Sequence, residues 1–325
     1  MKTEKTISPD WLSDPAVVRL FDILEQGDEH ARIVGGAVRN HLIGVALKSD
    51  VDFAVTTTPE ETSARLEAAG IRVVPTGIEH GTILAIIDDI GYEITTLRKD
   101  LETDGRRAIV AFGTDFAEDA NRRDFTMNAL YVDRHGCIYD YVEGLADVET
   151  MRVRFIGDAE QRIREDYLRI LRFFRFFAWY GQHRPDADGL KASMRLKDGL
   201  KTLSAERIWA EIQKLFLAPD PSRALLWMRQ VGVLSQLLPE SEKWGIDAFP
   251  ALMRAENEHG WRVDPIVRLM SIVPKRLDSV NDIAARWRLS NADRDRMRAW
   301  SNLSAQLPKN DAVLRALAYR HTKQA

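Results

Sequence analysis

A glycine pair followed by an acidic pair is the stretch of this sequence whose residue types and spacing best suit chemistry. Gly35 and Gly36 stand between a short apolar segment and a segment with helical character, and Asp50 and Asp52 follow at the edge of a second apolar segment. Glycines at a strand-to-helix turn let backbone N–H groups approach an anion, and the helix N-terminus adds partial positive charge. The stretch predicts a place to hold a triphosphate and its metal.

The two aspartates indicate which metal would be held. Residues two positions apart in a strand project from the same face, so Asp50 and Asp52 can point at one metal pair. Paired hard oxygens suit Mg²⁺, which keeps waters and substrate phosphates in its other positions. The glycine pair and the aspartate pair each have an ordinary alternative. A glycine pair commonly marks a simple turn, and an Asp-x-Asp at the start of a strand commonly lies in a solvated turn. The glycine spacings of Rossmann and Walker loops are also absent.

Composition places the chain among ordinary globular proteins. With 325 residues, 45% of them hydrophobic, the chain can build two or three packed units. The N-terminus has no apolar segment and there is no run of 18 apolar residues, which predicts a cytoplasmic protein without a membrane span. A single cysteine excludes an internal disulfide, and scattered histidines argue against a histidine-built metal centre. Any metal should therefore be held by oxygen atoms.

Positive charge is local rather than global. The net charge of −3 does not by itself indicate nucleic-acid binding. Between Arg152 and Arg175, however, seven arginines stand against four acidic residues. A second group near the C-terminus is a candidate for phosphate contacts, although exposed helical arginines are usually only solvated: Arg286, Arg288, Arg294, Arg296 and Arg298.

The periodicity of the first half predicts an α/β unit. Strands are expected at residues 31–34, 51–56, 71–74, 82–87, 92–96 and 129–132, and helices at 15–26, 37–43 and 59–69. Strands mixed with helices over this length suggest one open mixed sheet. Residues 98–121 are polar around a short apolar patch, which predicts a mobile loop.

The second half predicts helices only. Long helices are expected at residues 160–180 and 204–217, and prolines separate further helical segments up to the end of the chain. The expected architecture is an α/β domain with a mixed sheet followed by an all-α part. The predicted domains are the α/β domain at residues 1–145, a helical neck at 146–218, and a helical body or tail at 219–325.

A series of motifs resembles one protein family. Gly-Gly-Ala-Val-Arg at residues 35–39 and Asp-Val-Asp at 50–52 are similar to the signature of the class II tRNA nucleotidyltransferases, which are CCA-adding enzymes and bacterial poly(A) polymerases of the polymerase-beta superfamily. Arg-Arg-Asp-Phe-Thr-Met-Asn-Ala-Leu at residues 122–130 resembles a further block of that family. Other blocks follow in matching order at residues 93–98, 140–147, 156–158, 165–172 and 204–207. The resemblance covers residues 33–216.

The resemblance implies an activity and assigns roles. CMP and AMP would pass from CTP and ATP to the 3′ end of tRNA, without a nucleic-acid template. Asp50 and Asp52 would hold two Mg²⁺ ions, and Glu93 would be either a third carboxylate or a surface residue. The triphosphate would be surrounded by the backbone of the glycine pair and by two guanidinium groups, which grip phosphate oxygens through two donors at once. Its expected ligands are Gly35, Gly36, Arg39 and Arg123.

A charged stripe in the second half is the candidate for choosing the nucleotide. Its members follow at spacings of three residues: Asp166, Arg169, Arg172 and Arg175. One interpretation is a salt-bridged helix face that includes an ordinary Glu165–Arg169 pair. The other reading is base recognition. Cytosine and adenine each present an amine donor beside a ring-nitrogen acceptor, which an Asp acceptor beside an Arg donor matches. In the family, the residues matching Asp166 and Arg169 play this part.

The sequence departs from the family pattern at three places. Asn40 stands where the common motif has Asp, Glu143 replaces a frequent glycine, and little helical sequence follows the last block. The absence of a His-Asp dipeptide argues against the hydrolytic domain of some relatives. The alternatives to CCA addition are a poly(A) polymerase, an enzyme adding only CC or only A, and a non-catalytic RNA-binding protein. Nothing in the sequence indicates an oligomeric state.

Overall fold

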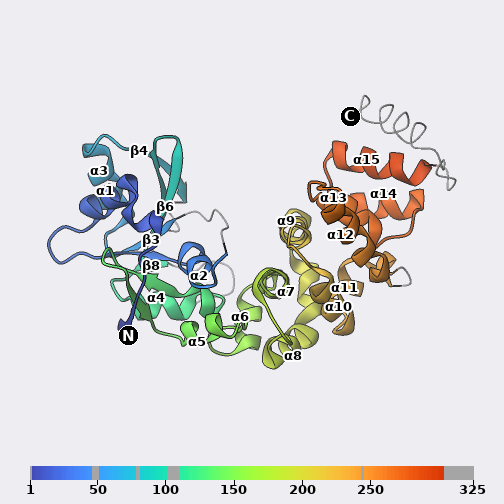
Figure 1. Cartoon of the computed structure of the whole chain (residues 1–325), viewed down its shortest axis with the longest axis horizontal. Coiled ribbons are helices and arrows are strands. Elements are labelled where there is room, and N and C mark those ends of the chain that lie inside the picture. The colour runs from blue at the N-terminus through green and yellow to red at the C-terminus, as the bar shows by residue number, and fades with distance from the viewer. Residues whose placement is uncertain (1, 46–50, 78–80, 101–109, 243–244, 304–325) are drawn as a thin grey trace. The chain divides into compact units, whose positions relative to one another are not determined.

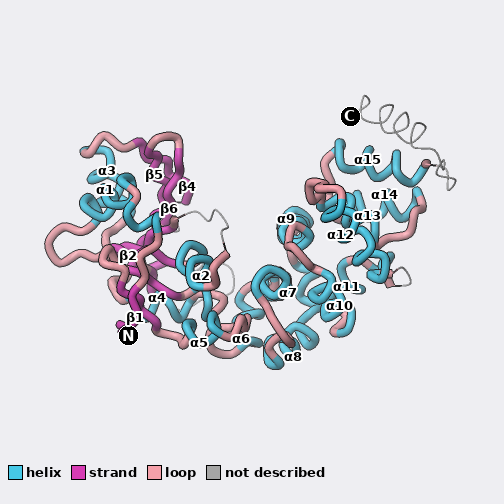
Figure 2. The backbone as a smooth tube through the Cα atoms, in the orientation of Figure 1, coloured by secondary structure: helices cyan, strands magenta, loops and turns pink. Residues whose placement is uncertain are grey.

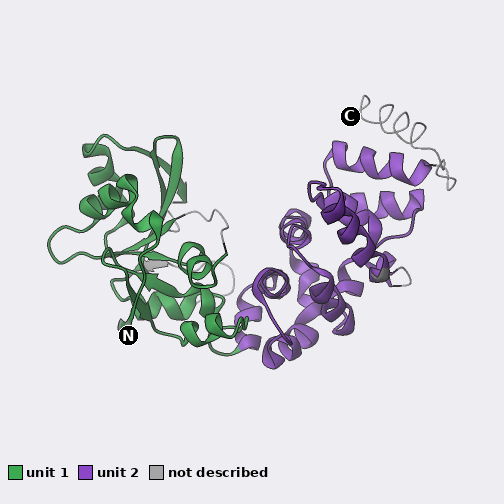
Figure 3. Ribbon diagram, in the orientation of Figure 1, with its two compact units in different colours: residues 1–158 green, residues 159–325 purple. Residues whose placement is uncertain are grey.

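The chain folds into two compact units. The computed structural model describes residues 2–45, 51–77, 81–100, 110–242 and 245–303 (Figure 1). The units comprise Met1–Asp158 and Ala159–Ala325 (Figure 3). The finer division predicted at residues 145 and 218 stays a prediction. No described helix is long and apolar enough to cross a membrane.

The first unit is built on a mixed sheet (Figure 2). Neighbouring strands are antiparallel except for the parallel pair β3 and β6, so the predicted mixed sheet is confirmed. In the described residues its eight strands lie in the order β1 (Lys2–Thr6), β10 (Cys137–Asp140), β9 (Leu130–Val132), β2 (Ala31–Val34), β3 (Asp52–Val55), β6 (Ile90–Thr96), β5 (Thr82–Ile87) and β4 (Arg72–Gly77).

Alternating burial and helix caps account for these elements. Every second side chain of β5 is buried, the pattern of a strand with one face in the core. Helix α1 (Pro15–Leu24) begins where the Asp14 carboxylate accepts the N–H of Ala16 at 2.8 Å and where proline occupies the first turn. The rings of Phe21 in α1 and Phe53 in β3 pack edge-on with their centres 5.1 Å apart, and this contact anchors the helix on the sheet. Helix α3 (Pro59–Ala68) follows β3.

The predicted loop at residues 98–121 is wrong for the part of this segment that the structure describes. Strands β7 (Arg98–Asp100) and β8 (Val110–Phe112) pair with each other, and helix α4 (Phe116–Arg122) follows. Phe116 and Ala120, one helical turn apart, are buried in a cluster with Tyr131. Two apolar positions are enough to fix such a short helix, but they are too few to give a helical period in the sequence.

The second unit is helical, and no strand lies in its described residues. This confirms the predicted all-α part. Its helices are α6 (Ala159–Glu165), α7 (Leu168–Tyr180), α8 (Ala187–Leu196), α9 (Ala205–Phe216), α10 (Ser222–Gln230), α11 (Val233–Leu237), α12 (Phe249–Glu258), α13 (Pro265–Ser271), α14 (Leu277–Arg286) and α15 (Asn291–Asn302).

The single long helix predicted at residues 160–180 is wrong, because the chain breaks after Glu165. The Asp166 carboxylate accepts the backbone N–H of Leu168 at 3.1 Å, and its backbone oxygen accepts the N–H of Arg169 at 3.0 Å. A side chain that bonds its own neighbouring backbone competes with the helical ladder. Asp166 therefore lies in the connection between α6 and α7 and not on a helical stripe.

A buried ion pair joins three helices of the second unit. Arg268 of α13 and Glu256 of α12 have side-chain exposures of 2% and 5% and lie 2.6 Å apart. Arg268 also donates to the backbone oxygens of Phe216 and, at 2.6 Å, Ala218, at the end of α9. Phe216 ends α9 and Ala218 lies just beyond it, so Arg268 binds carbonyl groups that the helix end leaves without an intrahelical donor.

Removing one member of this pair should be costly, because the other charge would stay buried without compensation. We expect Glu256→Ala to lower the free energy of unfolding by about 3–5 kcal/mol in urea denaturation. The control is Glu206→Ala, which removes the partner of Arg288 in a pair whose side chains are 57% and 71% exposed. That change should cost no more than about 1 kcal/mol. Equal losses in the two variants would contradict the proposed role.

Candidate active site

A glycine turn connects the central strand β2 to a short helix. Gly35 has φ 83° and ψ −121°, a conformation open to glycine and strained for other residues, and α2 (Gly36–Leu42) begins at the next position. The antiparallel register places Val34, the last residue of β2, opposite Asp52, the first residue of β3. The glycine turn and the Asp52 carboxylate are thus brought to the same end of two paired strands.

Two candidate metal ligands, Asp52 and Glu93, lie on neighbouring strands at this end of the sheet. Asp50 lies outside the described residues, whereas Asp52 is half-buried. Phe53 pairs with Ile94 across the parallel strands β3 and β6, so Asp52 and Glu93 occupy the neighbouring positions before that pair. Side chains at matching positions of adjacent strands project from the same face. Asp52 and an exposed Glu93 therefore offer neighbouring carboxylate oxygens, the donor type that Mg²⁺ prefers.

No group of three or more potential metal-binding side chains is found among the described residues. Asp50 lies outside those residues. The chemistry of Asp52 and Glu93 fits a hard divalent cation, and the assignment of a metal to Asp50 and Asp52 stays a prediction.

Arg39 is buried and lies on α2, four residues after Gly35. Its Nε and Nη2 donate to the Asn40 side-chain oxygen at 3.1 and 2.9 Å, and its Nη1 donates to the side-chain oxygen of Asn128. Asn40, at the position where the motif commonly has Asp, thus binds the Arg39 guanidinium through the oxygen of a neutral amide. These contacts fix the direction of the guanidinium, and its contact with a triphosphate stays a prediction.

Arg123 lies beside a buried carboxylate. Its Nε donates to Asp119 Oδ2 at 3.0 Å and lies 3.1 Å from the Tyr131 hydroxyl, and that hydroxyl donates to Asp119 Oδ2 at 2.7 Å. Burial by itself would raise the pKa of Asp119, but the charges of Arg123 and Arg122 outweigh it and hold this pKa below its ordinary value. Burial raises the pKa of Tyr131 well above its usual range, so its hydroxyl stays a neutral donor.

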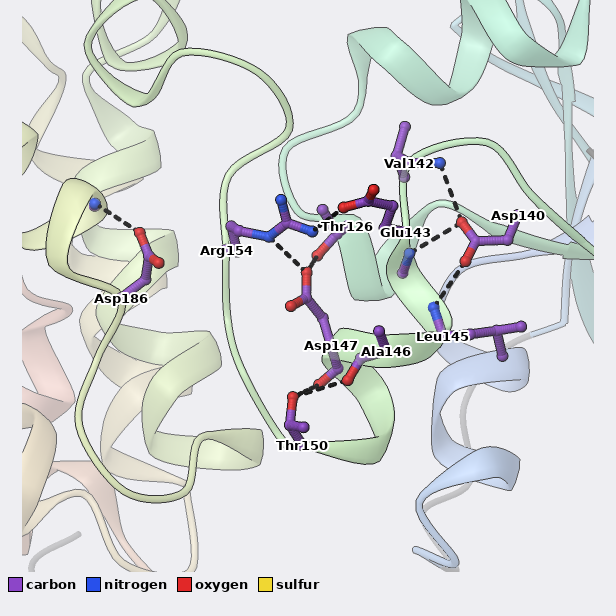
Figure 4. A network of polar contacts seen from close by, with 12 residues as sticks. Thr126, Asp140, Val142, Glu143, Leu145, Ala146, Asp147, Thr150, Arg154 and Asp186 are labelled. Atoms are coloured by element: carbon purple, nitrogen blue, oxygen red, sulfur yellow. Dashed lines mark hydrogen bonds and ion pairs between the residues drawn. The ribbon is translucent and has the colours of Figure 1, made fainter.

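Two acidic side chains stabilise the segment that follows Arg123 through hydrogen bonds (Figure 4). The Asp140 carboxylate accepts the backbone N–H groups of Val142, Gly144 and Leu145 at 2.9–3.1 Å. The Asp147 carboxylate accepts the Thr126 hydroxyl and, at 2.8 Å, Nε of Arg154.

Helix α5 (Gly144–Glu149) is thereby held against the short turn at Thr126–Asn128. A Cβ on Gly144 would come within 2.3 Å of the Thr126 backbone oxygen, so the contact requires glycine. Glu143, which replaces a frequent glycine of the motif, adopts φ 62° in the left-handed region. Its side chain pairs with Arg154 at 3.3 Å. The segment therefore keeps the turn that glycine would favour.

In the second unit, the nucleotide-selecting candidates Asp166 and Arg169 have separate partners. Asp166 Oδ2 accepts Nη2 of Arg207 at 2.7 Å. Arg169 Nη1 donates to the backbone oxygen of Arg162 at 2.7 Å and to the Glu165 carboxylate. The Glu165–Arg169 pair considered in the sequence is thus present.

Two further arginines, Arg172 and Arg175, follow along α7, and both are half-buried. Arg175 Nε donates to the buried Glu211 carboxylate at 2.6 Å, and its guanidinium lies 4.6 Å from the Phe176 ring centre. Burial, with the nearby charge of Arg172, lowers the pKa of Arg175 against the opposing effect of Glu211. Arg175 is therefore a structural cation of the helix packing in this state, and the predicted nucleotide contacts of Arg172 and Arg175 stay predictions.

The C-terminal arginine cluster is engaged within the protein. Each of its members has a partner with a side-chain oxygen, and the pairs are Arg286–Glu240, Arg288–Glu206, Arg294–Asp295, Arg296–Asp264 and Arg298–Asn281. Such ion pairs and hydrogen bonds are typical of arginines on a protein surface, the ordinary alternative to phosphate binding. Phosphate contacts by this cluster stay a prediction.

Four polar side chains were missed in the sequence: Asp119, Asn128, Tyr131 and Arg207. Only Asp119 left a local signal, because it stands four residues before Arg123, a spacing typical of helical ion pairs. Asn128 and Arg207 lie inside recognised motifs, but their partners are far away in the sequence. Tyr131 reads as a plain strand residue.

The sequence is similar to those of known protein families and curated proteins. Residues 31–154 match the family described as Poly A polymerase head domain, and residues 186–244 match the family described as probable RNA and SrmB-binding site of polymerase A. The CCA tRNA nucleotidyltransferase 1, mitochondrial, of Mus musculus is 36% identical over 301 residues, which are 90% of this chain and 68% of the mouse protein. The Danio rerio protein of that name is 42% identical over 234 residues, 70% of this chain and 54% of the fish protein.

A solved structure extends the likeness to three dimensions. The Bacillus stearothermophilus CCA-adding enzyme in complex with CTP is 25% identical, with a TM-score of 0.63, and the match covers 90% of this chain and 82% of that one. Both units of the chain thus have counterparts in a protein of known structure.

The glycine turn provides a direct test of the site. We expect Gly35→Ala to lower the free energy of unfolding by about 1–3 kcal/mol through backbone strain, because the nearest atom to an added Cβ is 3.9 Å away and space is not limiting. Affinity for a nucleoside triphosphate, measured by calorimetry, should fall as well. Gly44→Ala is the control, since Gly44 also has a positive φ, of 68°, with open space around it. It should lose stability and keep its affinity; a matching loss of affinity in both variants would count against the site.

Proposed function

Because this chain belongs to the CCA-adding enzyme family, we propose that it transfers CMP and AMP from CTP and ATP to the 3′ end of tRNA without a nucleic-acid template. The observation that carries the proposal is the register of β2 and β3, in which the residue before Gly35 lies opposite Asp52. An anion-binding turn beside a metal-binding carboxylate is what transfer from a triphosphate requires.

We propose Mg²⁺ as the metal, held by Asp50 and Asp52. Enzymes of this family are nucleotidyltransferases that need divalent metals. When bound, the ions would lower the pKa of the attacking 3′-hydroxyl and stabilise the departing pyrophosphate. The carboxylates hold the ions, and Glu93, at the position next to Asp52, adds negative charge on the same face. The preference for Mg²⁺ rests on the oxygen character of this donor set.

The proposed task of Gly35, Gly36, Arg39 and Arg123 is to bind the triphosphate. Backbone N–H groups at the start of α2 favour an anion, and the conformation of Gly35 directs the chain into that helix. The side chain of Arg123 is 22% exposed, whereas Arg39 is fixed deeper in the unit. Arg123 is accordingly the guanidinium better placed to meet a ligand arriving from solvent.

Nucleotide choice is proposed for Asp166 and Arg169. A carboxylate offers about four acceptor positions, of which Asp166 uses one for Leu168 N–H and one for Arg207. It can accept an exocyclic amine in addition. Arg169 would donate to the neighbouring ring nitrogen, so the pair would accept cytosine and adenine and leave polar groups unpaired opposite guanine and uracil.

The proposed substrate is tRNA, because the relatives named above act on tRNA and the second family match is described as an RNA-binding site. The relatives include mitochondrial enzymes, so the predicted cytoplasmic location stays a prediction.

Extension of tRNA tests the proposed function and Asp52 together. Purified protein with tRNA that lacks its CCA end, Mg²⁺, CTP and ATP should add CCA and then stop. Continued addition of A would identify a poly(A) polymerase, and addition of only C or only A a partial enzyme. No extension under any nucleotide combination would overturn the proposal.

In the same assay, Asp52→Asn should reduce incorporation by roughly 10³-fold, because metal-bound charge stabilisation is worth several kcal/mol. Binding of tRNA, followed by gel shift, should remain. Asp22→Asn, which changes an exposed carboxylate of α1 that pairs with Arg134, is the control and should retain full activity. Undiminished incorporation by the Asp52 variant would remove it from the catalytic centre.

Arg169→Ala should blur the choice of nucleotide. The preference for CTP and ATP over GTP and UTP, measured as a ratio of kcat/KM values, should fall about 10- to 100-fold, which corresponds to one lost buried hydrogen bond. Arg164→Ala is the control, because Arg164 pairs with Glu160 and is 55% exposed in the same unit. If the preference survives in the Arg169 variant, templating by this residue is wrong.

A further inference from the structure

Asp119 is a buried carboxylate that the proposed mechanism does not use. It lies on α4, its side chain is 1% exposed, and it accepts from three donors, which belong to Arg122, Arg123 and Tyr131. A charge this far from water is costly unless it is paired. Here the pairing is complete enough to keep the group ionised.

The contacts of Asp119 select one edge of the Arg123 guanidinium. Nε and Nη2 of Arg123 each lie 3.0 Å from Asp119 Oδ2. The Tyr131 hydroxyl bridges the same oxygen, at 2.7 Å, and lies 3.1 Å from Arg123 Nε. Since a guanidinium is planar and rigid, binding one edge sets the direction of the whole group.

The bridge also ties Arg123 to the frame of the active site. Tyr131 lies in β9, where the register pairs it with Val34, the residue immediately before Gly35. The rings of Phe116 in α4 and Tyr131 pack edge-on with their centres 5.5 Å apart, and this contact holds α4 on the same strand. A chain of contacts through Asp119 and Tyr131 therefore connects the Arg123 guanidinium to β2, the strand that leads into the glycine turn.

We propose that Asp119 is a positioning residue, which fixes the edge of Arg123 and thereby its grip on the triphosphate of the incoming nucleotide. This inference rests on the proposed function, because it takes Arg123 as a triphosphate ligand. Without the carboxylate, the long arginine side chain would sample many rotamers, and part of the binding free energy would go into ordering it. The base of the nucleotide is read elsewhere, so Asp119 should affect all nucleotides equally.

A double-mutant cycle separates positioning from simple structural support. We expect Asp119→Asn to weaken CTP binding, measured by calorimetry without tRNA, about 10- to 100-fold. In an Arg123→Ala background the same change should weaken binding by no more than about threefold, because the group to be positioned is gone. The preference for CTP over UTP and the affinity for tRNA should stay as in the unchanged protein.

The outcomes are decisive in both directions. Unchanged CTP binding in a folded Asp119→Asn protein, or equal losses with and without Arg123, would overturn the inference. If Asp119→Asn does not fold, Tyr131→Phe takes its place, since it keeps both charges and removes only the bridging hydroxyl. That variant should weaken CTP binding about threefold, again only while Arg123 is present. No effect would overturn the inference.

This test stands apart from the test of the proposed function. A protein that binds CTP and fails to extend tRNA would contradict CCA addition and leave the CTP-binding cycle readable. A protein that extends tRNA and shows no coupling between Asp119 and Arg123 would keep the proposed function and reject the positioning role.

Discussion

The antiparallel pairing of β2 with β3 is the interaction on which the candidate active site depends. It sets Val34 opposite Asp52, so the glycine turn and the carboxylate share one end of the sheet. The neighbours continue the same frame, because Tyr131 of β9 pairs with Val34 and Ile94 of β6 pairs with Phe53. A ladder of backbone hydrogen bonds is far stiffer than any side chain, and catalytic groups need placement on such rigid elements.

Paired charges in the interior give the second level of order. In the first unit Asp119 holds Arg123, and in the second unit Glu211 holds Arg175 and Glu256 holds Arg268. Each pair costs desolvation, and each fixes the direction of a guanidinium that would otherwise be among the most variable side chains. For Arg268 the result is a junction of three helices. For Arg123 the result is a guanidinium whose Nε and Nη2 edge is held by Asp119.

Local patterns served the prediction of regular elements well and failed where the pattern was short or interrupted. The strand at Thr82–Ile87 shows clean alternation, and it was predicted with its correct bounds. Helix α4 rests on two buried apolar side chains, so its surroundings read as a loop. The break at Asp166 was missed because the apolar period continues across it, while the side chain bonds the backbone instead. Strand β1 is polar, and only its pairing with β10 makes it a strand.

The sequence by itself determined which chemical groups are available: glycines that suit an anion, carboxylates that suit a hard cation, and guanidinium groups that suit phosphates and bases. It also determined the class of each unit, because periodicity and turn residues are local properties. The tertiary structure decided which groups act on one another. Asp166 meets Arg207, 41 residues away, and Arg39 meets Asn128, 89 residues away. Such partners are set by strand register and helix packing, which depend on the whole core and leave no trace in the local spacing of residues.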